Sequence, residues 1–303
     1  VTDFSGKEKQ NLTVLPGKPL ALFKDCLQHI HILTNKKIFE VFLQDSSIML
    51  HKGIDKKEFT EAMNGCLFEI GNKLYFEDLA YHNFMKRCYY VRKEDSLRHE
   101  LTLIADEKKI DMLADNPFDR RFLSESGSKI TLGNMRSTEQ DLELIDEIRS
   151  ESNYSRFIKM AYYTKVNAPV FPLGDSVCIF NHPNNRIEIF SHMDSLVGTT
   201  PVTYHLKSKK NTLQTVIDAF APASEWLEEI YMDRKKWKAY TLFQNINGTR
   251  DLMEIDLFSG KTEYVLTIPF PYVQKMNIHD GFIYFIYKGW GEGQNKKLFR
   301  QKI

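Results

Sequence analysis

The stretch from Ala168 to His205 constrains the fold of this chain more than any other feature. It contains four short strand-like segments, which are Val170–Leu173, Ser176–Phe180, Arg186–Phe190 and Val197–Tyr204. The residues between them are Gly, Asp, Pro, Asn and Ser, which favour tight turns. Short apolar runs split by such residues are typical of strands joined by hairpins. The sequence therefore predicts one complete four-stranded antiparallel unit here.

The first hairpin of this unit, Phe171–Phe180, recurs along the chain. Close copies lie at Phe68–Phe76 and Met276–Phe285, and weaker ones at Leu20–Thr34, Phe122–Leu132 and Ile230–Phe243. Their turns are roughly 50 residues apart, which is the period of four-stranded propeller blades. Gly71 and Gly174 occupy two of these turns, where we expect positive φ. The sequence thus predicts an all-β fold, a six-bladed β-propeller in a single domain over residues 1–303, with five blades as the alternative.

Two parts of the chain depart from this regular pattern. The last unit ends one strand short at Lys296–Ile303, and Asn11–Leu15 could supply the missing strand and close the ring. The third unit contains Thr138–Ser152, whose leucine and isoleucine residues recur at helical spacing. We interpret residues 137–152 as a helical insertion, either a packing element or a lid or partner contact. A shorter helix is expected at Leu213–Phe220.

Charge and hydropathy exclude two classes of partner. The chain has 41 basic and 40 acidic residues, interspersed, for a net charge of +1. The chain therefore has no overall electrostatic attraction to nucleic acid or to an anionic membrane. No apolar run approaches the roughly 20 residues of a transmembrane span. The first residue is Val1 rather than Met, so we expect that a targeting segment preceded it.

Three segments carry a resemblance to a known group of proteins. They are VNAPVFPLGDSVCIFNHPNNRIEIF, WKAYTLF and GFIYFIY. Together they resemble the secreted six-bladed β-propeller proteins of Bacteroides-type bacteria, and more distantly the NHL-type and TolB-type propellers. The resemblance implies an exported protein, periplasmic or associated with the outer membrane, and allows a lipid anchor upstream of residue 1. Most members have no established activity, so the resemblance transfers no catalytic residue.

The four cysteines give little direct information. Cys26, Cys66, Cys88 and Cys178 include no CxxC pair, and three disulfide pairings are open. A chain of this length can build a large core without a covalent staple. We therefore expect buried free thiols.

No catalytic or cofactor motif is present. The sequence lacks GxSxG, HExxH, P-loop, EF-hand and GxGxxG patterns, so we assign no catalytic residue and expect no cofactor. His29 and His31 share one face of a strand, a spacing that could chelate a metal, but the sequence identifies no third ligand. We expect both to be structural, with no tightly bound metal.

One end of the predicted propeller carries aromatic and polar loop residues. They are Tyr81, His82, His182, Asn184, Arg186 and Trp290. Aromatic stacking combined with hydrogen-bonding groups suits recognition of a sugar or a peptide, although polar turns with incidental aromatics are the alternative. The sequence favours a monomeric, non-enzymatic envelope propeller that binds a protein or carbohydrate ligand through this face. The alternatives are a polysaccharide hydrolase or lyase acting at the channel mouth, and a purely structural module.

Overall fold

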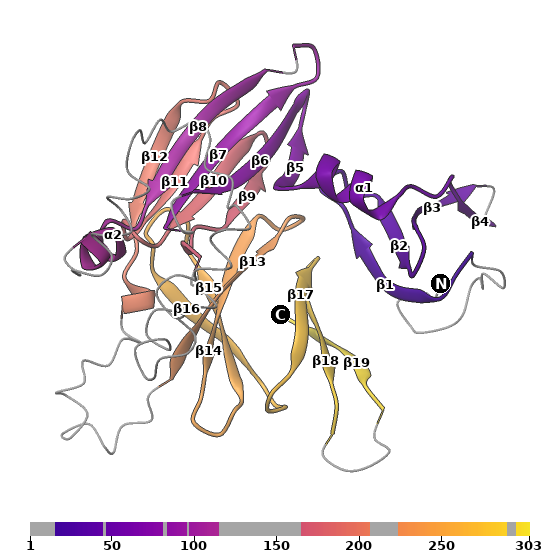
Figure 1. Cartoon of the computed structure of the whole chain (residues 1–303). Coiled ribbons are helices and arrows are strands. Elements are labelled where there is room, and N and C mark those ends of the chain that lie inside the picture. Colours follow the sequence, from indigo (N-terminus) through magenta and orange to yellow (C-terminus); the bar gives the residue numbers. More distant parts are fainter. Residues whose placement is uncertain are drawn as a thin grey trace, which may run out of the picture. The chain divides into compact units, whose positions relative to one another are not determined.

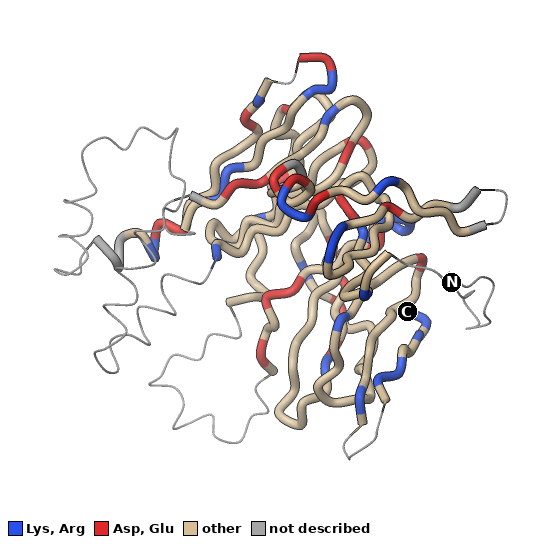
Figure 2. Tube along the Cα trace, turned by 45° about the vertical axis from the view of Figure 1, so that its right-hand side comes forward, with Lys and Arg blue, Asp and Glu red and all other residues tan. Residues whose placement is uncertain are grey.

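The computed structural model of the chain describes residues 16–44, 47–80, 84–95, 97–114, 165–206, 224–289 and 295–303. The chain divides into two compact units. The first is formed by Val1–Asp78 with Cys88–Leu101, and the second by Leu79–Arg87 with Thr102–Ile303. Within the described part, neither helix is long and apolar enough to cross a bilayer. Basic and acidic residues are interspersed along the trace (Figure 2), as they are in the sequence.

Five sheets are built from strands that follow one another in sequence (Figure 1). The first two are β1 (Pro19–Lys24), β2 (Ile30–Thr34), β3 (Ile38–Gln44) and β4 (Ser47–Leu50), then β5 (Cys66–Ile70), β6 (Lys73–Ala80), β7 (Met85–Arg92) and β8 (Arg98–Ala105). The next two are β9 (Val170–Leu173), β10 (Ser176–Asn181), β11 (Arg186–Phe190) and β12 (Leu196–Pro201), then β13 (Glu225–Asp233), β14 (Lys238–Gln244), β15 (Arg250–Ile255) and β16 (Thr262–Ile268). The last contains β17 (Gln274–His279), β18 (Phe282–Tyr287) and β19 (Lys297–Lys302).

The fold is all-β, with the sheets of a β-propeller, and this prediction is confirmed. Five blade sheets lie within the described residues. The sixth predicted hairpin, Phe122–Leu132, lies outside them, as do the helices predicted at 137–152 and Leu213–Phe220 and the closing strand Asn11–Leu15. The single domain and its closed ring therefore stay predictions.

Strand β10 is almost completely buried. Every residue except Ser176 is buried, and the neighbours β9 and β11 pair with its two edges. Its side chains Cys178 and Phe180 join a core that includes Trp226, from β13. A nearly continuous apolar strand is the sequence signature of such two-sided burial.

The turn glycines have the predicted conformation. Gly71 has φ of 60° and Gly174 has φ of 62°. A Cβ added to either would meet nothing within 4 Å. The requirement for glycine at these hairpins therefore comes from the backbone alone, since a left-handed φ is costly for most other residues.

Two short helices were not predicted. They are α1 (Lys56–Met63) and α2 (Glu107–Ala114). Asp55 caps α1, because its side chain accepts hydrogen bonds from the backbone N–H groups of Lys57 and Glu58. Both helices are only eight residues long, which is too short for a clear apolar periodicity in the sequence.

The expectation of four free thiols is wrong for two cysteines. Cys26 and Cys66 form a disulfide that joins the end of β1 to the start of β5. Cys88 and Cys178 are free and buried, as expected. Burial raises the pKa of the Cys178 thiol to about 12, so it stays protonated and unreactive. The sequence could not choose a pairing, because the contact between residues 40 apart is set by the fold.

Candidate functional site

The predicted binding residues are in different environments. Tyr81, His82 and Trp290 lie outside the described residues. Asn184 and Arg186 are exposed around the β10–β11 turn. The guanidinium of Arg186 donates from Nε to Oε1 of Glu188 at 2.6 Å, so part of its hydrogen-bonding capacity is used within the strand.

His182 lies inside the protein rather than on its surface. It is 5% exposed, with Nε2 2.8 Å from the hydroxyl of Tyr204 and Nδ1 3.1 Å from the backbone carbonyl of Asn167. Its ring centroid is 4.7 Å from that of Trp226. Burial lowers the pKa of His182 to about 3, and His205 nearby adds to the shift. A neutral, enclosed imidazole does not fit the role of an exposed binding residue.

An exposed aromatic residue lies at another loop of the same unit. Tyr272, between β16 and β17, is 55% exposed, and its backbone N–H donates to the carbonyl of Gly248 at 3.1 Å. Gly248 has φ of 81°, and a Cβ there would lie 2.8 Å from the Tyr272 ring. Glycine thus permits the close contact between loop backbone and ring. Sequence analysis did not identify Tyr272, because its position against the β14–β15 loop depends on tertiary contact.

The loop that supports Tyr272 is held by its own hydrogen bonds. The backbone N–H of Asn245 donates to the carbonyl of Thr249 at 2.8 Å. The side chain of Asn247 accepts from the backbone N–H of Thr249 at 3.0 Å and from its hydroxyl at 2.6 Å. These contacts define the shape of the loop, so the Tyr272 ring rests on an ordered support. Ile246, at the tip, is largely exposed.

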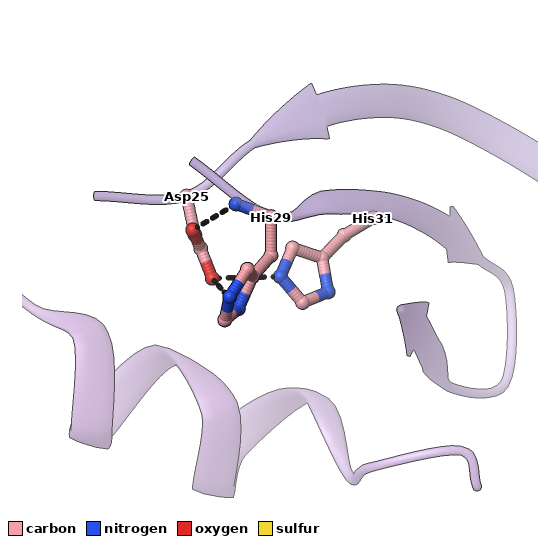
Figure 3. Close-up of side chains that lie close together, drawn as sticks. All are labelled: Asp25, His29 and His31. Atoms are coloured by element: carbon pink, nitrogen blue, oxygen red, sulfur yellow. Dashed lines mark hydrogen bonds and ion pairs between the residues drawn. The ribbon is translucent and has the colours of Figure 1, made fainter. Parts of the chain in front are cut away.

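A second candidate site, in the first unit, contains the two histidines of the predicted pair. His29 precedes β2 and His31 lies in it, and side chains two residues apart share one face of a strand. Asp25, which follows β1, places Oδ2 2.8 Å from Nε2 of His31 and 3.6 Å from Nδ1 of His29 (Figure 3). The turn between the strands therefore brings a carboxylate and two imidazoles together.

Backbone contacts fix the carboxylate of this cluster. Oδ1 of Asp25 accepts the backbone N–H of His29 at 2.8 Å, and the backbone N–H of Asp25 donates to the carbonyl of His29 at 2.9 Å. The side chains of Asp25 and His31 are each 4% exposed, whereas that of His29 is 50% exposed. Two members of the cluster are thus held inside the protein, and the third faces solvent.

Asp25 is a potential third ligand beside His29 and His31, which sequence analysis did not identify. One potential ligand atom from each of Asp25, His29 and His31 lies within 4.8 Å of the other two. The sequence does carry a signal, since Asp25 stands four residues before His29 at the predicted hairpin turn. It was missed because aspartates recur at many turns, where they usually bond their own backbone.

Comparison with known proteins adds little to this description. No family model matches the chain, and no curated protein matches it. Among solved structures, a candidate 6-phosphogluconolactonase from Bacteroides uniformis has 9% identity and a TM-score of 0.32, over 91% of this chain and 68% of that one. The propeller domain of the Trilobed protease from Pyrococcus furiosus has 10% identity and a TM-score of 0.32, over 94% and 84%. At such scores the fold assignment rests on the five sheets themselves.

Proposed function

We propose that this chain is a non-enzymatic β-propeller of the cell envelope that binds a protein or glycan through one loop face. The observation that carries this proposal is the half-exposed ring of Tyr272, supported by the backbone of Gly248. Tyr81, His82 and Trp290 belong to the same proposal as predicted contributors. Asn184 and Arg186 add exposed polar groups at a second loop.

A supported aromatic ring suits ligand binding for an energetic reason. Tyrosine has few rotatable bonds, and the contact with Gly248 restricts the ring further, so little entropy is lost on binding. The ring can stack on the apolar face of a sugar or on a side chain of a protein, while its hydroxyl group forms hydrogen bonds. An anchor of this kind contributes about 2 kcal/mol to binding.

The test is a binding screen of the wild type and Tyr272→Ala against glycan arrays and extracts of envelope proteins. We expect the variant to bind the selected ligand about 30-fold more weakly, which corresponds to about 2 kcal/mol. Melting curves should coincide, because more than half of the side chain is exposed. The glycan arrays and the protein extracts distinguish a glycan from a protein ligand.

Tyr264→Ala is the matched control. Tyr264 lies on β16, is 60% exposed, and its hydroxyl is 2.9 Å from that of Thr267. Removing it deletes a similar area of exposed aromatic surface away from the loops. Equal weakening by both substitutions, or none by Tyr272→Ala, would count against the proposed face.

The proposed location is the periplasm or the outer membrane, with the chain acting as a monomer. It is supported by the resemblance to exported propellers. Cell fractionation of the full gene product tests the location, and recovery only in the cytoplasm would contradict it. Light scattering of the purified protein tests the monomer.

A further inference from the structure

We propose that Asp25, His29 and His31 bind a divalent transition metal of the zinc class, leaving at least one coordination position open. This site is independent of the proposed loop face, because it lies in the first compact unit and Tyr272 lies in the second. Three protein ligands with an open position are the arrangement of metal sites that retain a water molecule or an exchangeable ligand.

The distances are close to those of a coordinated metal. Metal–ligand bonds of about 2.0–2.1 Å in a tetrahedral site place the ligand atoms about 3.3 Å apart. Oδ2 of Asp25 lies 2.8 Å from Nε2 of His31 and 3.6 Å from Nδ1 of His29. The remaining separation, between the two imidazoles, is no more than 4.8 Å. The site therefore forms when the half-exposed His29 moves towards the other two ligands and the contact between Asp25 and His31 lengthens by about 0.5 Å.

The burial of Asp25 favours a positively charged partner for its carboxylate. The side chains of Asp25 and His31 are each 4% exposed, and Oδ2 of Asp25 lies 2.8 Å from Nε2 of His31. A buried carboxylate is costly unless it is paired, and a metal bound to both side chains would supply the positive charge.

Packing fixes the two enclosed ligands in place. The ring of His31 stacks on Phe23 at 5.3 Å between centroids, and Phe59 of α1 meets it edge-on at 4.9 Å. The disulfide of Cys26, the residue next to Asp25, ties the turn to β5. The ligands are therefore largely pre-organised, which reduces the conformational cost of binding.

The charge around the open side also favours a cation. Oε1 of Glu40 lies 3.5 Å from Nδ1 of His29. Glu40 is on β3, directly across the ladder from His31. A second carboxylate so close to the three ligands raises the negative potential at the site.

The ligand set decides which metals fit. Two imidazoles and one carboxylate suit zinc and its first-row neighbours, whereas calcium and magnesium prefer all-oxygen sites. The nearest cysteine, Cys26, is held in the disulfide and offers no thiolate. Zinc(II) is therefore the ion to test, with magnesium and calcium as comparison ions.

The experiment is isothermal titration of the metal-free, oxidised protein with zinc chloride. We expect about one zinc per chain, a rise in melting temperature on binding, and no comparable signal from magnesium or calcium. His29→Ala should weaken zinc binding at least about 100-fold, since even outer-shell changes cost about 10–100-fold. The fold should survive, because the His29 side chain is half exposed.

Two further variants keep the result interpretable. Asp25→Asn retains an oxygen that can accept the backbone N–H of His29 but removes the charge, and it should also lose zinc. His99→Ala is the matched control, because His99 forms a histidine–aspartate pair with Asp95, at 3.1 Å, outside the cluster. Absence of stoichiometric zinc binding in the wild type, or equal binding in the wild type and His29→Ala, would overturn the proposal.

Discussion

The two histidine clusters of this protein have opposite surroundings. In the first unit, one ring nitrogen of His29 and one of His31 face the carboxylate of Asp25, and His29 is open to solvent. In the second, the nitrogens of His182 face a phenol and a backbone carbonyl, both neutral, and the ring is enclosed. The difference shows that the spacing of histidines in a sequence indicates a function only when the groups around their ring nitrogens are known. A carboxylate and access to solvent permit metal or proton chemistry, whereas neutral partners and burial indicate packing.

The enclosed cluster contributes to the core of the second unit. Trp226 donates from Nε1 to the hydroxyl of Thr241 at 2.7 Å, and its ring contacts those of His182, Tyr204 and His205. Burial raises the pKa of Tyr204 above its ordinary value, so its hydroxyl stays protonated and can donate to His182. The cluster thereby joins β10 and the 3-10 turn Tyr204–Leu206 to β13.

The largest loss of stability is expected from Trp226→Ala. The indole is 9% exposed, and its removal leaves a cavity among three aromatic rings. We expect the free energy of unfolding to fall by about 3–5 kcal/mol, measured by urea denaturation. Zinc binding at the first unit should remain. A loss below about 1 kcal/mol would show that the cluster is not part of the core.

Removal of the disulfide should have the next largest effect, and it concerns the first unit. The Cys26–Cys66 bond closes a loop with a sequence separation of 40. Replacing both residues with Ser should lower the free energy of unfolding by about 3–4 kcal/mol, through the greater entropy of the unfolded chain. Zinc affinity should also fall, because Asp25 loses its anchored neighbour. Addition of a reductant should lower the free energy of unfolding of the wild type but not that of the double variant. Equal responses of the two proteins would contradict the assignment of the disulfide.

The smallest loss of stability is expected on acidification, and it tests the enclosed cluster. The pKa of His182 is about 3 in the folded protein and about 6.5 when unfolded, so protons bind preferentially to the unfolded chain. The stability associated with neutral His182 is complete above pH about 6.5 and is lost progressively towards pH about 3. Between pH 7 and 5 we expect a loss of about 2 kcal/mol.

The comparison variant for this measurement is His182→Phe. It removes the titrating group, so its free energy of unfolding should depend less on pH over this range. Parallel pH profiles for the wild type and His182→Phe would refute the assignment of the effect to His182.

The sequence by itself determined the strands and their hairpins. The repeated apolar runs and polar turns predicted the hairpins of all five described sheets, and glycine at Gly71 and Gly174 predicted the left-handed turns. These features are local, because strand pairing across a two-residue turn depends on residues a few positions apart. The short helices α1 and α2 were missed, since eight residues carry too little periodicity.

The tertiary structure decided the surroundings of these polar residues. Asp25, His29 and His31 share one local hairpin, but the Cys26–Cys66 bond and the edge-on contact of Phe59 with His31 depend on packing between segments distant in sequence. Likewise, the sequence placed His182 next to a polar turn, and only the fold enclosed it against Trp226. The physical reason is that hairpins are specified by neighbouring residues, whereas the burial and charge environment of a side chain depend on segments distant in sequence.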